Sequence, residues 1–162
     1  MYISTRDNQG PVSASQAIYL GMVPGGGLFV PEKIPRLSLE QIEAMEEMDY
    51  PRLAKTILGL FLDDYTDEEL QDCADKAYGR NFFHEDIAPI TVLEDFGGVL
   101  ELWHGPTAAF KDMALQIMPH LLSKALIKEG SGNQVLILVA TSGDTGKAAL
   151  EGFKNVPGIK IA

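Results

Sequence analysis

Lys111 is the residue whose type and position best suit nucleophilic chemistry. Residues 99–103 have the branched and aromatic composition of a strand, and Gly105-Pro106 ends it. Apolar residues then recur at helical spacing over residues 113–127, so Lys111 is expected in the first turn of a helix. The positive end of the helix dipole disfavours an ammonium ion there. The sequence therefore predicts an amine that can condense with an aldehyde cofactor, the alternative being an ordinary surface lysine.

A short polar segment near the end of the chain is the second candidate, because it lies where a strand end is expected to meet a helix start. Its glycines let backbone N–H groups turn inward, and the helix dipole favours an anion such as a carboxylate or a phosphate. A plain helix cap made by a side chain is the alternative. A P-loop is excluded, because Thr141 and Ala148 replace residues that it requires. The segment consists of Ser142, Gly143, Asp144, Thr145 and Gly146.

His104 is a further candidate, because a histidine titrates near neutrality and can act as an acid or a base. Its ring can equally anchor the glycine-proline turn that follows it. Trp103 is expected to pack in the core or between domains, and His84 and Cys73 receive no chemical role. The many acidic residues of the first half are expected to form a solvated face. No metal site is expected, since no histidine stands at ligand spacing among them.

Residues 103–112 read Trp-His-Gly-Pro-Thr-Ala-Ala-Phe-Lys-Asp and resemble the lysine motif of the threonine synthase family. Members of that family are fold-type II pyridoxal-phosphate enzymes. Three further segments match the family in the same order, at residues 2–6, 21–31 and 140–146. The resemblance covers the whole chain. Because four motifs occur in the family's order, chance similarity is a poor explanation.

The resemblance implies a reaction in which O-phospho-L-homoserine and water become L-threonine and phosphate. Lys111 matches the lysine that forms a Schiff base with pyridoxal 5'-phosphate and then moves protons. The polar loop matches the segment that holds the substrate carboxylate and approaches the ring hydroxyl of the cofactor. The resemblance assigns Lys111, Phe110, Asp112 and Asp144 to the cofactor, and Ser142, Gly143, Asp144 and Thr145 to the substrate.

Two other functions stay open beside threonine synthesis. One is a related pyridoxal-phosphate phospho-lyase that eliminates phosphate without making threonine, and the other is a non-catalytic module that retained the fold. The family's chains run much further, and their later part carries the glycine-rich cradle for the cofactor phosphate. The chain is therefore expected to be a truncated N-terminal portion that is inactive alone. It then needs the remainder of its own chain to complete the site.

Residues 1–85 are predicted to form a small, mostly helical domain. Capping-box pairs are expected to begin three helices, and Pro51 falls where the first turn of a fourth helix accepts a proline. Between two strand-like segments, residues 2–5 and 28–30, Pro24 and three glycines predict a tight turn. The capping pairs are Ser13 with Gln16, Ser38 with Gln41, and Thr66 with Glu69.

Residues 86–162 are predicted to begin a parallel-sheet domain, so the fold class is α/β, and the resemblance implies that this is the three-layer domain of the fold-type II kind. Two strands flank a turn at residues 94–97, and Pro119 should kink the long helix that follows. A later apolar run is typical of a strand buried on both faces, and it opens a right-handed strand-helix-strand unit. The expected strands are residues 89–93, 98–103, 135–140 and from 159; the expected helices are residues 113–127 and 147–153.

Composition limits the partners and the location of the protein. The 162 residues carry a formal net charge of -10 with a pI of about 4.6, which excludes a polyanion such as nucleic acid as partner. The single cysteine, Cys73, cannot form an internal disulfide. No secretion signal is expected, because the first residues lack a basic stretch followed by an apolar core, and the longest apolar run is too short to span a bilayer. We therefore expect a soluble, cytoplasmic protein without a nucleic-acid or membrane partner, and the resemblance implies that its partner is a small amino-acid phosphate.

Overall fold

The first half of the chain is mostly helical, as the sequence predicts. The computed structural model describes residues 1–94 and 97–162. The second and fourth helices begin at complete capping boxes, and Pro51 lies in the first turn of the third. The glycine turn before β2 has positive φ at three successive glycines. The elements are β1 (Tyr2–Ser4), α1 (Ala14–Leu20), β2 (Phe29–Pro31), α2 (Leu39–Glu43), α3 (Tyr50–Gly59) and α4 (Asp67–Ala77).

The second half contains an antiparallel hairpin and a parallel strand pair. Strand β3 (Ile90–Leu93) pairs with β4 (Gly97–Leu100), and the turn predicted at residues 94–97 includes two residues outside the described ranges. Strands β5 (Val135–Ile137) and β6 (Ile159–Ile161) are parallel and are joined by α7 (Asp144–Phe153). The predicted strand-helix-strand unit is therefore confirmed.

The long helix predicted over residues 113–127 is wrong as a single element. It is divided into α5 (Asp112–Leu115) and α6 (Met118–Lys128), with Pro119 in the first turn of α6. Pro119 has no N–H to donate to the carbonyl four residues earlier, that of Leu115. That carbonyl instead lies against Gly152 of α7, where a Cβ would come within 1.9 Å of it. Packing against α7 therefore turns the expected kink into a break.

Three further boundaries differ from the prediction. The strand expected to reach residue 103 ends at Leu100, and the helix expected from residue 147 begins at Asp144. The strand expected over residues 135–140 likewise ends early, at Ile137. The run at 135–140 is also not buried on both faces, since Leu136 is 55% exposed and Leu138 is 75% exposed. One face of the β5–β6 pair is thus uncovered in this chain.

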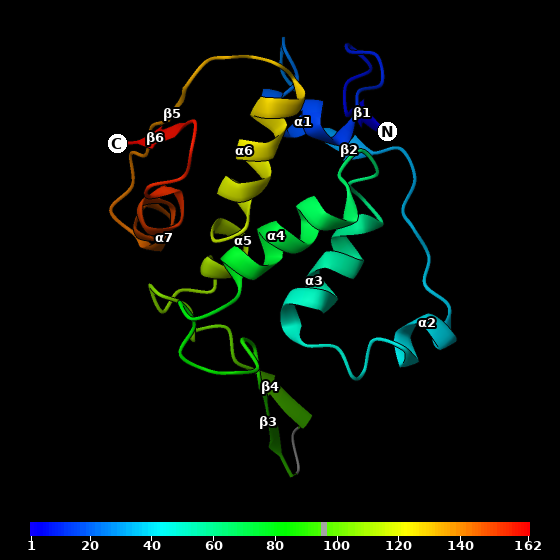
Figure 1. Cartoon of the computed structure of the whole chain (residues 1–162), viewed down its shortest axis with the longest axis vertical. Coiled ribbons are helices and arrows are strands. Elements are labelled where there is room, and N and C mark those ends of the chain that lie inside the picture. Colours follow the sequence, from blue (N-terminus) through cyan, green and yellow to red (C-terminus); the bar gives the residue numbers. More distant parts are fainter. Residues whose placement is uncertain (95–96) are drawn as a thin grey trace.

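Helix α6 lies at the centre of the molecule, between the N-terminal helices and the β5–α7–β6 unit (Figure 1). Leu121 belongs to a cluster with residues of α4 such as Leu70 and Cys73. Leu122, the next residue, belongs to a second cluster with residues such as Phe153 of α7. Side chains from both sides of residue 85 therefore share a core, and the domain boundary predicted there stays a prediction.

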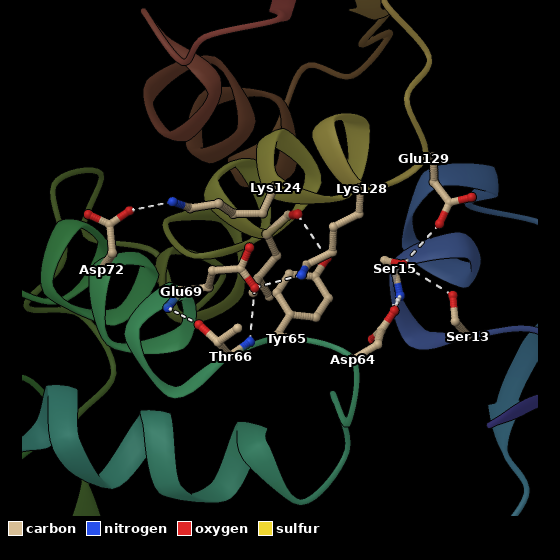
Figure 2. Close-up of polar contacts among 11 residues, drawn as sticks. Ser13, Ser15, Asp64, Tyr65, Thr66, Glu69, Asp72, Lys124, Lys128 and Glu129 are labelled. Atoms are coloured by element: carbon tan, nitrogen blue, oxygen red, sulfur yellow. Dashed lines mark hydrogen bonds and ion pairs between the residues drawn. The ribbon is translucent and has the colours of Figure 1, made fainter.

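Charged side chains join α6 to α4, as Figure 2 shows. Lys128 Nζ lies 2.7 Å from Glu69 Oε2, and Lys124 Nζ lies 2.9 Å from Asp72 Oδ2. Hydrogen bonds from Lys76 and then Lys124 lower the pKa of Asp72. Such partly exposed pairs contribute little individually, but both lie on the face of α6 that meets α4. Further bonds join Ser15 Oγ to Glu129 and the Tyr65 hydroxyl to the Leu121 carbonyl.

The β3–β4 hairpin projects from the rest of the chain (Figure 1). Every residue of its two strands is exposed, including Val92 at 76%. Among the described residues, no helix has both the length and the apolar character that crossing a membrane requires.

Candidate active site

The turn at residues 105–112, which we call the lysine turn, is built around the buried carboxylate of Asp112. Asp112 is completely buried, and its Oδ2 accepts a hydrogen bond from the Thr107 N–H at 2.8 Å. Its Oδ1 accepts from the Thr107 hydroxyl at 2.7 Å. A Cβ at Gly105 would lie 2.5 Å from Asp112 Oδ2, so only glycine fits beside this carboxylate. Asp112 therefore fixes the shape of the turn from inside.

Lys111 lies at the N-cap of α5, one residue before the helix, with φ -65° and ψ -19°. The prediction placed it in the first turn of a longer helix; since α5 is a single turn, the helix dipole acting on the amine is smaller than expected. Its Nζ lies 4.1 Å from the ring centre of Phe110, which is 60% exposed. Among the described residues, no carboxylate lies within ion-pair distance of this amine. The amine is thus available to a ligand.

The polar segment at residues 142–146, which we call the anion loop, leads directly into α7. Gly143 is the N-cap, and no side chain caps the helix, so the alternative of a side-chain cap is wrong. The Gly143 N–H donates to Thr141 Oγ1 at 3.2 Å, which bends the chain into the helix. A Cβ at Gly146 would lie 2.6 Å from Thr141 Cγ2, so the bend requires glycine there. The first amides of α7 are therefore left for an anion.

Two neighbouring pockets receive the candidate residues. One pocket, which we call the lysine pocket, has a volume of about 490 Å³ and is lined by Lys111, Phe110 and Thr145. Tyr50 and apolar side chains from α5 complete its lining. A second pocket of about 620 Å³ lies between the Thr107 turn and the start of α7. Its lining includes Pro106, Thr107, Ser142, Gly143 and Lys147. Helix α7 thus contributes to both pockets.

The predicted site residues are therefore only partly brought together. Thr145 shares the lysine pocket, whereas Ser142 and Gly143 face the adjacent one. Asp112 lines neither pocket and serves the turn, and Asp144 lines neither pocket. The roles that the resemblance assigns to these residues stay predictions.

His104 is held by groups that the sequence did not single out. Its Nε2 lies 2.6 Å from Glu101 Oε2, and Glu101 also accepts a hydrogen bond from the Thr91 hydroxyl. Hydrogen bonds from Thr91 and then His104 lower the pKa of Glu101. The His84 ring, to which the sequence assigned no chemical role, lies 5.1 Å from that of His104. This arrangement favours the anchoring role for His104.

Trp103 does not lie in the core, because its side chain is 50% exposed, and packing between domains stays a prediction. The sequence also missed two polar residues that join the site, Thr107 and Lys147. Lys147 Nζ donates to the Thr107 carbonyl at 3.0 Å across 40 positions of sequence. The one feature of the sequence that could have pointed to Lys147 is the position of this cation in the first turn of the helix that follows the anion loop. Within the described ranges, no cluster of three or more His, Cys, Asp or Glu side chains suits a metal ion.

Comparison with known proteins identifies the family. A family model described as the threonine synthase N terminus matches residues 1–78. A threonine synthase of Methylobacillus glycogenes is 39% identical over 99% of this chain, which spans 35% of that protein. A threonine synthase-like 2 protein of Xenopus laevis is 39% identical over 94% of the chain and 32% of its own length. The X-ray structure of PLP-bound threonine synthase from Brucella melitensis matches with a TM-score of 0.91 and 34% identity, covering 99% of this chain and 34% of that one.

These matches identify the chain as the N-terminal portion of a member of a pyridoxal-phosphate-dependent lyase family. The chain belongs to the threonine synthase family. It spans about a third of the length of the relatives it matches. The predicted α/β fold class and the predicted cofactor, pyridoxal 5'-phosphate, are both confirmed.

Proposed function

We propose that the full-length protein that carries this chain converts O-phospho-L-homoserine and water into L-threonine and phosphate. The threonine synthase relatives support this reaction. One observation in the structure carries it: Lys111 and Thr145, which come from two separate motifs, line the same pocket. A nucleophilic amine can bind the aldehyde cofactor, and the start of an uncapped helix can bind the carboxylate of an amino-acid substrate.

The lysine pocket fits the cofactor. Its volume is about 490 Å³, its lining is largely apolar, and no described carboxylate neutralises the Lys111 ammonium group. Lys111 is proposed to hold the aldehyde carbon, with Phe110 as a neighbour in the pocket. The contact that the resemblance assigns to Asp144 lies outside this pocket. When bound, pyridoxal phosphate supplies an electron sink for negative charge on the substrate.

The chain's own residues would bind the substrate and move protons. The amides at the start of α7, with Ser142, Gly143 and Thr145, bind the substrate carboxylate, because the helix dipole favours an anion there. The Lys111 amine accepts and returns protons once the substrate has taken its place. Asp112 holds the turn, because both of its oxygens bond Thr107 and its side chain lines neither pocket.

The relatives extend well beyond the part that this chain matches. The corresponding part of the full-length protein is proposed to hold the cofactor phosphate and the pyridine nitrogen. A cytoplasmic location is part of the same proposal. The only cysteine, Cys73, is buried, which suits a reducing compartment. Burial raises the pKa of its thiol to about 11, so a reactive-thiol function has no support.

Borohydride reduction tests the role of Lys111. The full-length protein is mixed with pyridoxal phosphate, reduced and digested, and the labelled peptide is identified by mass spectrometry. We expect label on Lys111 and none in Lys111→Arg, while Lys160→Arg, a control on β6, labels like the unaltered protein. A label on another lysine, or none at all, would contradict the proposal and favour a non-catalytic module.

Product analysis tests the reaction itself. With O-phospho-L-homoserine as substrate, we expect threonine and phosphate in equal amounts. The second candidate, which the resemblance leaves open, is a phospho-lyase that releases phosphate without making threonine; some relatives are named threonine synthase-like 2 rather than threonine synthase. Phosphate release with a 2-oxo acid and ammonia in place of threonine would support that candidate.

A further inference from the structure

Thr107 is bonded to both halves of the candidate site. Its carbonyl accepts a hydrogen bond from Lys147 Nζ of α7 at 3.0 Å. Its N–H and its hydroxyl donate to Asp112, the first residue of α5, at 2.8 and 2.7 Å. Every polar group of Thr107 is therefore used to connect the lysine turn with the helix of the anion loop.

The Asp112 end of this connection has no substitute partner. Asp112 is fully buried, and no described lysine, arginine or histidine forms an ion pair with it. Gly105 packs directly against it, so the carboxylate cannot turn toward solvent without moving the backbone. A buried carboxylate that loses its donors is costly, and this cost holds Thr107 in place.

A second contact fixes the other end of α7. A Cβ at Gly152 would lie 1.9 Å from the Leu115 carbonyl, so the backbones of α7 and α5 touch there. Lys147 and Gly152 are five positions apart on α7, and both contact the segment around α5. The helix is therefore held near its start by a side chain and near its end by direct packing.

We propose that Lys147, Thr107 and Asp112 form a clamp that sets the distance between the Lys111 amine and the first amides of α7. All three are positioning residues, since their polar atoms bind one another. Reacting groups held in one geometry avoid an entropic cost that looser groups must overcome, so the clamp should raise the turnover rate. The effect on turnover rests on the proposed function, whereas the clamp itself rests only on these contacts.

Hydrogen exchange of the full-length protein tests the clamp directly. Lys147→Met keeps the apolar stem and removes the donors, and Lys154→Met is a matched control, because Lys154 lies at the other end of α7 and lines the same pocket. We expect the Thr107 amide to exchange about threefold to tenfold faster in Lys147→Met than in the unaltered protein. Equal exchange in the two variants would overturn the clamp.

Turnover separates positioning from ligand binding. In Lys147→Met and Thr107→Val, we expect kcat to fall by about threefold to tenfold with KM changed less than about twofold, and Thr107→Ser to recover most of the rate. If Lys147 instead binds the substrate anion, KM rises while the Thr107 amide stays protected, and the proposal is wrong. Absence of label on Lys111 in the unaltered protein would reject the proposed function alone, because the exchange result does not depend on it.

Discussion

The lysine turn and the anion loop both contain an aspartate and glycines, but the two regions use these residues in opposite ways. In the lysine turn, Asp112 is buried and both of its oxygens accept hydrogen bonds from Thr107. In the anion loop, Asp144 is exposed and the helix that it begins has no side-chain cap. Glycine also differs in its use: Gly105 makes room for a buried carboxylate, whereas Gly143 leaves the helix end bare.

This difference shows how the site divides its work. The proposed nucleophile needs a fixed backbone, and the polar groups of its turn are satisfied within the protein. The proposed ligand-binding helix end needs unsatisfied amides, and a side-chain cap is absent there. We therefore expect changes in the lysine turn to alter stability strongly, and changes in the anion loop to alter ligand binding with little effect on stability.

The largest effect is expected from Asp112→Ala compared with Asp144→Ala. Removing the Asp112 carboxylate leaves the buried Thr107 donors without an acceptor, which should cost about 3 kcal/mol of unfolding free energy. Asp144→Ala removes only a favourable charge at the start of α7 and should cost less than about 1 kcal/mol. Urea unfolding measures both. Equal losses would show that the two aspartates play the same structural role.

Gly105→Ala should have the next largest effect. The added methyl group would lie 2.5 Å from Asp112 Oδ2, and the turn must shift, at a cost of about 2 kcal/mol in unfolding free energy. Gly10→Ala is the control, because nothing lies within 4 Å of the added atom there. Thermal unfolding compares the two variants. A Gly105→Ala protein as stable as the Gly10→Ala control would mean that Asp112 can move freely.

Relief of backbone strain should act in the opposite direction. Ala108 has φ 56°, in the left-handed region that glycine adopts at lower cost. Ala108→Gly should therefore gain about 0.5 kcal/mol in urea unfolding. The neighbouring Ala109 is buried and has no positive φ, so Ala109→Gly should lose about 1 kcal/mol. A loss in both variants would show that the strain at Ala108 is negligible.

Local rules predicted much of this fold, because the groups that decide it lie close in sequence. Thr66 and Glu69, three positions apart, start α4 by bonding each other's backbone, and this pairing is visible in the sequence. The break between α5 and α6 was not predictable in this way. It depends on the Leu115 carbonyl meeting Gly152, and only the folded chain brings those two residues together.

The same limit applies to the site. Lys111 and Thr145 were found from the residues on either side of them, and the structure brings them to one pocket. Lys147 and Thr107 were missed, because their bond spans 40 positions and neither residue belongs to a recognisable chemical pair. Motifs therefore located the groups that can contact a ligand, and the contacts that position those groups required the structure.

Gly143→Ser gives the smallest expected change in stability and the sharpest test of the comparison. The φ of Gly143 is -112°, which serine adopts without strain, and its hydroxyl can cap α7, so the unfolding free energy should rise by a few tenths of a kcal/mol. The same hydroxyl would occupy amides that the proposed substrate carboxylate needs, so KM should rise in the full-length protein. Gly143→Ala, which offers no cap, should gain no stability and serves as the control. Serine that stabilises α7 and leaves KM unchanged would show that the cap and the substrate do not compete for the same amides. The uncapped start of α7 would then not be the substrate-binding group.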